Sequence, residues 1–294
     1  DNLMKTYEIS LKNKALSPEG AFNDSVNVTM NSHNPRFASI ETADLKNVCY
    51  DRILEIARNL TSNAAAYTLT IIGNYDEATI RPLLEQYIAS LPSQKKVTKG
   101  KRVDTDAKGI VINSFKRKME TPKAMAIMVW SSEDIPYTLE NRIKADIAGQ
   151  VLSMIYLKKI REDASAAYSV GAQGSLNRGD EKIDCGLMAY CPMKPEKGDT
   201  ALAILRDEVP AMAKSCDADM LAKVKEYMLK SYDDRTKTNG YWSGIIKNFR
   251  DYGVDLHTDY KQTVQAQTPE TISAFIAEML KAGNRVEVVM MPEE

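Results

Sequence analysis

The sequence predicts an α+β fold in which helices pack on a largely antiparallel sheet. Patterns typical of strands occur as neighbours, at residues 109–115 and 124–130 and again at 167–173 and 183–191. Helical patterns follow one another as a run between residues 197 and 282. In a doubly wound parallel fold, strands and helices would instead alternate along the chain. The order of the elements therefore favours α+β, in a chain long enough for about two domains.

The second part of the chain carries most of these signals. Its first two strand patterns are short and strongly apolar, as expected for buried strands. Residues 141–160 have apolar side chains at helical spacing and predict a long amphipathic helix. The predicted inner face of this helix consists of Ile143, Ile147, Val151, Met154 and Ile155. The elements expected after it are helices near 197–214, 217–234, 239–250 and 269–282 and a final strand at 286–291.

The first 92 residues differ, because they contain only one clear strand pattern. Helical patterns cover residues 4–15 and 42–60, and a further helix is expected to begin at Asp76. Residues 67–72, YTLTII, are rich in β-branched and aromatic side chains and predict a buried strand. One strand cannot form a sheet, so this part resembles the tail of a domain whose opening strands are absent. We therefore expect it to expose an unpaired sheet edge or an apolar surface.

A polar stretch at residues 93–107, SQKKVTKGKRVDTDA, separates the two parts and is typical of a linker. The predicted organisation is an incomplete α+β domain at 1–92, the linker at 93–107, and a complete α+β domain with a six-stranded type of sheet at 108–294. The basic cluster at 95–102 can be a solvated part of the linker or a binding patch, and the solvated linker is favoured.

Composition excludes several classes of protein. The 39 basic and 40 acidic residues leave a net charge of −1, without the basic excess of a nucleic-acid-binding domain. Apolar stretches such as residues 124–130 are far shorter than the roughly 20 residues that span a bilayer, so no membrane span is expected. The chain begins DNLMKTYEIS, without an initiator Met or an apolar signal core. Either a leader was removed or the chain belongs to a longer protein, and the incomplete first domain favours the longer protein.

The four cysteines show no metal-binding or disulfide pattern. No CxxC pair occurs, so a cysteine zinc site is not expected, and buried free thiols are favoured instead. Two of them lie six residues apart on one predicted strand, which is too far for a disulfide bond. The cysteines therefore do not identify the cellular compartment. They are Cys49, Cys185, Cys191 and Cys216.

Three segments, in this order, resemble elements of the pitrilysin/insulinase family of zinc metallopeptidases. They are NSHNPRFASIETADL, YTLTIIGNYDEATIRPLLEQYIASLP and KIREDASAAYSVGAQGS, and the resemblance covers roughly residues 25–292. It implies an α+β domain repeated four times in a chain whose two halves close around a chamber. It also implies that this chain is the C-terminal half, of bacterial type, beginning inside the third domain and completing the fourth. The partner would then be the N-terminal, zinc-binding half, either of the same protein or on a partner chain.

The third segment carries the candidate site residues, Arg161 and Tyr168. The resemblance assigns them to the substrate, because the family has an Arg and a Tyr seven residues apart at this place. A guanidinium and a phenol are donors suited to a carbonyl oxygen or to the charge that develops on it. From spacing alone, an Arg at a helix C-terminus and a Tyr opening a strand would be ordinary structural residues. We expect both side chains to project toward one concave surface.

The zinc motif of the family, H-x-x-E-H, does not occur in this sequence. The only histidines, His33 and His257, have no ligand spacing and are expected to be structural or surface residues. The chain alone is therefore predicted to bind no zinc and to be inactive, with zinc held by the other half of the parent enzyme.

The leading hypothesis is thus the non-zinc-binding half of a zinc metalloendopeptidase that acts on peptides, with a periplasmic location favoured by the resemblance to bacterial members. The alternative is a catalytically inactive scaffold or interaction protein on the same fold, as in the mitochondrial bc1 complex. An independent hydrolase is disfavoured, since no G-x-S-x-G occurs and two histidines leave little choice of base.

Overall fold

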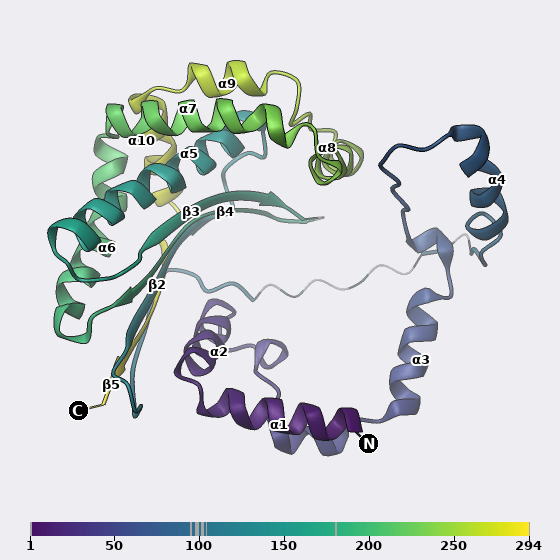
Figure 1. Cartoon of the computed structure of the whole chain (residues 1–294), viewed down its shortest axis with the longest axis horizontal. Helices are drawn as coiled ribbons and strands as arrows, with labels where there is room; N and C mark the ends of the chain where they lie inside the picture. The colour runs from purple at the N-terminus through teal and green to yellow at the C-terminus, as the bar shows by residue number, and fades with distance from the viewer. Residues whose placement is uncertain are drawn as a thin grey trace.

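The computed structural model describes residues 2–94, 96–97, 100, 103, 105–179 and 181–293. Its core is one sheet with the strand order β1-β5-β2-β4-β3 (Figure 1). β1 is parallel to β5, and the other three pairings are antiparallel. The predicted α+β fold with a largely antiparallel sheet is confirmed. The strands are β1 Ile110–Arg117, β2 Ala124–Ser132, β3 Gly171–Arg178, β4 Ile183–Met193 and β5 Asn284–Pro292.

Two details of the sheet differ from the sequence prediction. Within the described ranges the sheet has five strands, so the expected six-stranded type is wrong. The strand expected at 167–173 begins only at Gly171, because Ala167 makes no more than an isolated bridge to Met193 before the chain bends. Tyr168 therefore lies in a bend before the strand and does not open it.

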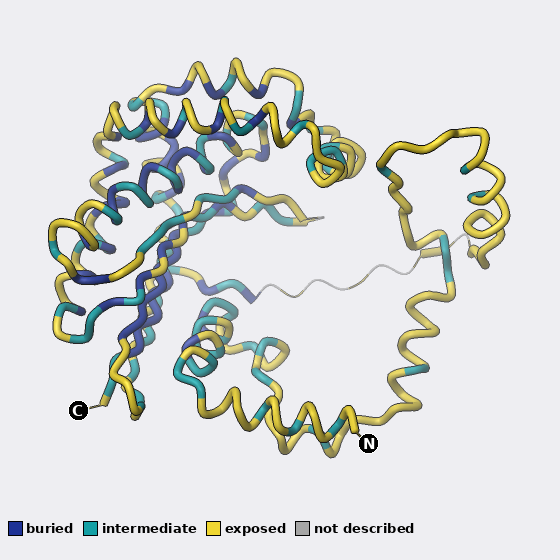
Figure 2. Tube along the Cα trace, viewed as in Figure 1, coloured by how far each residue is buried: buried dark blue, intermediate teal, exposed yellow. Residues whose placement is uncertain are grey.

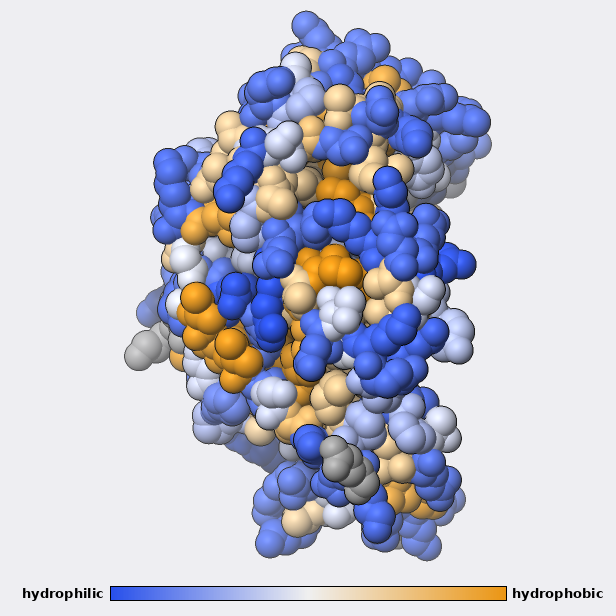
Figure 3. Space-filling view, turned by 90° about the vertical axis from the view of Figure 1, so that its left-hand side faces the viewer, coloured by the Kyte–Doolittle hydropathy of each residue, from blue (hydrophilic) through white to orange (hydrophobic). Residues whose placement is uncertain are grey.

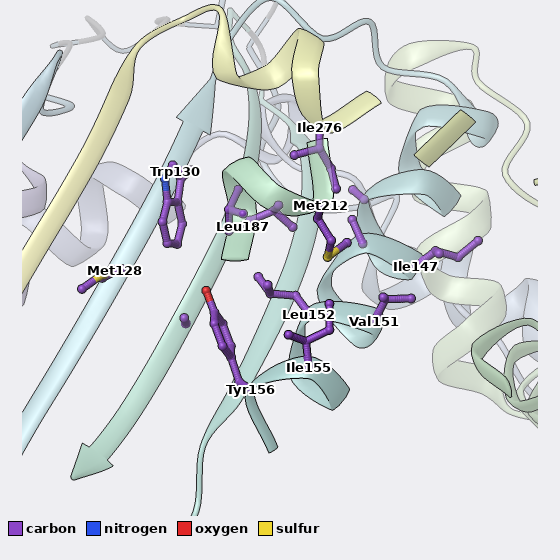
Figure 4. Close-up of a cluster of buried hydrophobic side chains, with 14 of the residues drawn as sticks. Met128, Trp130, Ile147, Val151, Leu152, Ile155, Tyr156, Leu187, Met212 and Ile276 are labelled. Carbon is purple, nitrogen blue, oxygen red and sulfur yellow. The ribbon is translucent and has the colours of Figure 1, made fainter. Parts of the chain in front are cut away.

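Most of the helices of the second part cover one face of this sheet (Figure 1). α5 fills the centre of the core with fully buried side chains such as Ile147, Leu152 and Tyr156, and Figure 4 shows Leu152 and Tyr156 on the side of the helix toward Leu187. The helix begins where the Thr138 hydroxyl accepts a hydrogen bond from the Asn141 amide, a standard N-cap. The helices are α5 Leu139–Tyr156, α6 Gly198–Lys214, α7 Ala218–Arg235, α8 Asn239–Tyr252, α9 Tyr260–Ala266 and α10 Pro269–Leu280.

A pair of glycines brings α5 into direct contact with the edge strand β3. A Cβ atom on Gly174 would lie 1.7 Å from the carbonyl oxygen of Ala145, and one on Gly149 would lie 1.9 Å from the Gly174 nitrogen. No side chain fits at such distances. Backbone therefore packs against backbone here, as expected where glycine occupies a close approach.

The opposite face of the sheet is covered by α2, Pro18–Met30. Phe22 on α2 is buried against Met125, Ile127 and Val288 of the sheet. The amide of Asn113 also donates to the Thr29 hydroxyl over 2.8 Å. α2 was not predicted from the sequence, whereas α1, Asn2–Leu16, matches the expected helix at 4–15.

The segment from residue 35 to residue 91 extends away from the sheet and is mostly exposed (Figure 2). Residues 67–72, predicted to be a buried strand, form no strand and join no sheet, and Leu69 is 56% exposed. The strand prediction is wrong here because no neighbouring strand in the described residues offers hydrogen-bond partners. The elements of this segment are 3₁₀ turns at Pro35–Phe37, Thr42–Asn47 and Ala64–Ala66 and helices α3 Tyr50–Thr61 and α4 Glu77–Tyr87.

Apolar side chains on the outer face of the second part are divided into small patches. Figure 3 shows the side that lies at the left of Figure 1, where these patches alternate with hydrophilic side chains. Across the described ranges, no helix combines the length and apolar character needed to cross a membrane. Much of the predicted linker and its basic cluster, including Lys95, Lys101 and Arg102, lies outside the described residues.

Candidate functional site

Arg161 lies on a continuation of α5 that changes its helical form. After Tyr156 the chain continues as a π-helix at Leu157–Asp163. This helical form is rare in proteins as a whole, but where it occurs it is frequently found at functional sites. Two buried side chains anchor this segment: the Tyr156 hydroxyl donates to the Leu205 carbonyl over 2.8 Å, and Ile160 is fully buried. Burial raises the pKa of Tyr156 well above its ordinary value, so this donor stays protonated. Arg161 itself is exposed, so its guanidinium projects from a fixed backbone.

The loop that follows is held in a strained conformation. Ser165 has a φ of 50°, in the left-handed region that non-glycine residues seldom adopt. The Ala166 amide donates to the Ile160 carbonyl over 2.8 Å, and the Lys194 amide donates to the Ala166 carbonyl over 2.8 Å. These bonds tie the loop to both the π-helix and the end of β4. Tyr168 leaves this framework with 83% of its surface exposed.

Two lysines from the end of β4 and the turn after it complete the surroundings of the loop. Lys194 Nζ lies 5.3 Å from the centre of the Tyr168 ring, within the range of a cation–π contact. Lys197 Nζ donates to the Ala164 carbonyl over 2.6 Å. Sequence reasoning missed both residues, because only the pairing of Ala167 with Met193 brings this part of the chain beside the loop.

The structure does not join the two predicted residues directly. Within the described part of the chain, Arg161 forms no ion pair, and no hydrogen bond or cation–π contact links it to Tyr168. Both side chains are therefore exposed donors that remain available to a ligand. Their projection toward one concave surface stays a prediction.

The two histidines occupy unrelated places. His33 has a φ of 55° and is exposed at the end of α2. His257 lies in an aromatic cluster, where its Nδ1 is 2.8 Å from the Tyr232 hydroxyl and 2.9 Å from the Tyr241 hydroxyl. Burial raises the pKa of Tyr241, so its hydroxyl stays a donor. Among the residues that the structure describes, no three His, Cys, Asp or Glu side chains are grouped so as to hold a metal ion. Those residues therefore do not fit a zinc site.

Three of the four cysteines are buried free thiols, as expected, but Cys49 is exposed. The prediction of burial is wrong for Cys49 because it lies just before α3, in the mostly exposed segment at residues 35–91. Burial raises the pKa of Cys185 and of Cys191 to about 12, and that of Cys216 to about 11. These three thiols are therefore unreactive at neutral pH.

Comparison with known proteins identifies the family. Residues 48–228 match the family model described as the peptidase M16 inactive domain. The chain belongs to the M16 peptidase family. This match covers the exposed segment from α3 onward and the strands β1 to β4 of the sheet, including Arg161 and Tyr168, but not β5.

The relatives agree with this assignment and confirm the resemblance stated above. The chain is 24% identical over 245 residues to the probable zinc protease PqqL of Escherichia coli strain K12, covering 80% of the chain and 26% of PqqL. The crystal structure of that periplasmic protease superposes with a TM-score of 0.82 at 21% identity, over 99% of this chain and 32% of PqqL. Pitrilysin superposes with a TM-score of 0.63 at 14% identity, over 98% of this chain and 31% of pitrilysin.

The first half of PqqL also has this fold, with a TM-score of 0.68 at 10% identity, over 98% of this chain and 65% of that half. Part of the first half of that protease thus shares the architecture found here. The present chain spans about a quarter of the length of the curated relative that it matches.

Proposed function

We propose that this chain is the C-terminal, non-zinc-binding half of a zinc metalloendopeptidase and that it forms part of the wall of a peptide-binding chamber. The observation that carries the proposal is the match to the inactive domain of M16 peptidases over residues 48–228. Likeness to both the whole of PqqL and its first half supports an assembly of two similar halves. The periplasmic location of PqqL supports the same location for this protein.

In this proposal Arg161 and Tyr168 contact the substrate. The π-helix and the strained loop hold their backbones, while both side chains are exposed and free to donate. A substrate carbonyl oxygen can accept from the two-pronged guanidinium and from the phenol, and both bonds strengthen as negative charge develops on that oxygen. Lys194 beside Tyr168 adds positive charge to this surface.

Zinc would be held by the other half of the parent enzyme, since the described residues of this chain do not fit a zinc site. The zinc ion in such enzymes supplies Lewis-acid activation of water and carbonyl groups. The exposed apolar side chains of α3 and α4 support a covering partner. Ile53 is 50% exposed, Leu60 64% and Leu83 49%, although all three lie on regular α-helices.

The test is steady-state peptide cleavage by the full-length protein. Tyr168→Phe removes one O–H donor and keeps the ring, and we expect kcat to fall roughly 10²–10³-fold if this donor meets the developing oxyanion. Arg161→Lys keeps the charge but loses the two-pronged geometry, and it should also lower kcat. Tyr227→Phe and Arg250→Lys are matched controls, since both residues are exposed and lie on α7 and α8, not on the π-helix or the loop.

Full activity with unchanged KM in both Tyr168→Phe and Arg161→Lys would sink the proposed role. The alternative of an inactive scaffold on the same fold would then gain support. Circular dichroism of the variants separates this outcome from misfolding, because neither exposed side chain contributes to the core.

A further inference from the structure

A second concave site lies far from Arg161 and Tyr168, beside the first turns of α5. It is a cavity of about 500 Å³ bounded by α5, the edge strand β3, the end of α7, and α8 and α9. Its lining residues on α5 include Arg142 and Asp146, which lie about five and about four helical turns before Arg161. The volume falls within the range of ordinary ligand pockets. It is therefore distinct from the loop that carries the proposed substrate contacts.

Two guanidinium groups without carboxylate partners line this cavity. Among the described residues, neither Arg142 nor Arg235 forms an ion pair, whereas Lys247 and Arg250 on α8 both pair with Asp251. Arg142 donates to the Tyr137 hydroxyl over 3.0 Å, and Arg235 lies 5.1 Å above the Tyr260 ring. Charged groups held by phenols and rings remain able to bind an anion.

The remaining charge in the cavity is Asp146, which accepts a hydrogen bond from the Gln150 amide over 2.9 Å. Two cationic side chains and one anionic side chain leave the described lining with a net positive charge. A carboxylate is attracted by that balance, while Asp146 can accept from a backbone N–H of the same ligand.

One wall of the cavity is the free edge of the sheet. β3 is the last strand in the order β1-β5-β2-β4-β3, and residues 173–177 of β3 line the cavity. An edge strand presents N–H and C=O groups that a second extended chain can pair with. The cavity thus places backbone donors and acceptors next to the two guanidinium groups.

α8 forms the opposite wall of the cavity and places two glycines on it. Its cavity face consists of Gly240, Tyr241, Gly244, Ile245 and Asn248, which repeat at helical spacing. A Cβ atom on Gly240 or Gly244 would meet no heavy atom within 4 Å. Glycine weakens a helix relative to alanine, and no close packing requires glycine here. These two positions therefore widen the cavity at the expense of helix stability.

We propose that this cavity binds an extended peptide segment that carries a carboxylate side chain. The peptide backbone lies along the edge of β3, the carboxylate accepts hydrogen bonds from Arg142 and Arg235, and neighbouring apolar side chains contact Ile143 and Ile245. The peptide nature of the ligand rests on the proposed function, whereas its negative charge rests on the cavity alone.

The test measures binding without turnover in the full-length protein. Two fluorescein-labelled ten-residue peptides differ only in one central Glu or Gln, and anisotropy gives their Kd in the presence of 1,10-phenanthroline, which prevents cleavage by a metallopeptidase. Arg142→Gln and Arg235→Gln should each weaken binding of the Glu peptide at least about tenfold and leave the Gln peptide nearly unchanged. Arg250→Gln, on α8 but outside the cavity lining, should change neither Kd.

Gly244→Leu fills the cavity and should abolish binding of both peptides, whereas Gly244→Ala adds only one methyl group and should retain it. Thermal unfolding shows whether the Leu variant is folded, and the Ala variant keeps the comparison usable. Equal Kd values for the Glu and Gln peptides would overturn the acidic preference. Unchanged binding in a folded Gly244→Leu variant would overturn the location.

The outcome is separable from that of the proposed function. Tyr168→Phe should lower kcat without changing either Kd, and the cavity variants should raise KM for acidic peptides without changing kcat. A failure of one pair of results leaves the other intact.

Discussion

Residues 42–91 and residues 105–293 contain helices of the same amphipathic kind, but only the second region buries their apolar faces. α3 has no buried residue, and Ile53 and Leu60 are 50% and 64% exposed. α5 buries Ile147 and Leu152 completely against the sheet and the neighbouring helices. An amphipathic pattern therefore specifies a helix and the direction of its apolar face. Burial of that face depends on an opposing sheet, and among the described residues the sheet belongs to the second region.

The largest difference in stability between the two regions is expected when one leucine is truncated in each. In the 294-residue chain, Leu152→Ala should lower the free energy of unfolding by about 2–5 kcal/mol, because it leaves a cavity in a packed core. Leu60→Ala should change it by no more than about 0.5 kcal/mol, because the side chain is exposed. Urea denaturation followed by circular dichroism measures both.

The same pair in the full-length protein sharpens the comparison. If a partner covers α3 there, Leu60→Ala should become as costly as a core truncation, about 2–5 kcal/mol. A cost that stays within about 0.5 kcal/mol in the full-length protein would show that α3 remains uncovered.

Elements with strong local patterns were predicted well from the sequence. The apolar runs of β2 and β4 and the helical spacing of α5 gave their type and, within a few residues, their position. α2 was missed because its polar sequence, PEGAFNDSVNVTM, carries little periodicity, although Ser17 caps it and Pro18 begins it. α9 is only seven residues long and gives no periodic signal.

The site was less accessible to sequence reasoning than the fold. Arg161 and Tyr168 were singled out by a family resemblance, but the π-helix, the φ of Ser165 and the contact with Lys194 depend on tertiary packing. The strand predicted at 67–72 does not form, because its formation also depends on tertiary packing and the described residues offer it no strand to pair with. Its side chains have strand propensity, but propensity without a pairing partner does not make a strand.

A second pair of variants tests how tightly the packed region is built. Gly174→Ala should destabilise the chain by about 1–3 kcal/mol, since the new Cβ would lie 1.7 Å from the Ala145 carbonyl oxygen. Gly244→Ala should stabilise it by roughly 0.5–1 kcal/mol, since the Cβ enters open space and alanine favours a helix. Thermal unfolding measures both, and equal effects of the two changes would contradict the close contact between α5 and β3.

Chemical modification of the cysteine thiols tests the difference in burial between the two regions without any mutation. Cys49 is exposed in the first region, and the other three cysteines are buried in the second. We expect 5,5′-dithiobis(2-nitrobenzoate) to modify one thiol rapidly in the native chain and the remaining three only after unfolding. Rapid modification of two or more thiols at neutral pH would contradict a closed core in the second region.

The same thiols give a pH dependence of definite sign. Burial raises the folded-state pKa of Cys185 and of Cys191 from an ordinary 9.0 to about 12. A raised thiol pKa contributes stability that is fully present below the unfolded pKa and is lost as pH rises toward the folded value. Urea denaturation between pH 8 and pH 10.5 should therefore show stability falling above about pH 9, less steeply in Cys185→Ala.

The smallest expected effect concerns two exposed aspartates, one in each region, that hold local turns. Hydrogen bonds from the Thr258 hydroxyl and from the amides of Thr258 and His257 lower the pKa of Asp255 to about 2. Hydrogen bonds from the hydroxyl and amide of Thr79 likewise lower the pKa of Asp76, the N-cap of α4. Both interactions are local in sequence and need no sheet.

The two aspartates should therefore titrate alike, although their regions differ in burial. For each aspartate, the lowered pKa contributes stability that is present above the pKa of the unfolded state and is lost as pH falls through the pKa of the folded state. For Asp255 this loss occurs between about pH 4 and pH 2. Solvent screening limits the contribution of Asp255 to roughly 0.5 kcal/mol or less. Carboxyl titration by NMR measures both pKa values. A depressed pKa at Asp255 with an ordinary value at Asp76 would show that the N-terminus of α4 does not form without a covering partner, so that the contrast between the regions extends from packing to local structure.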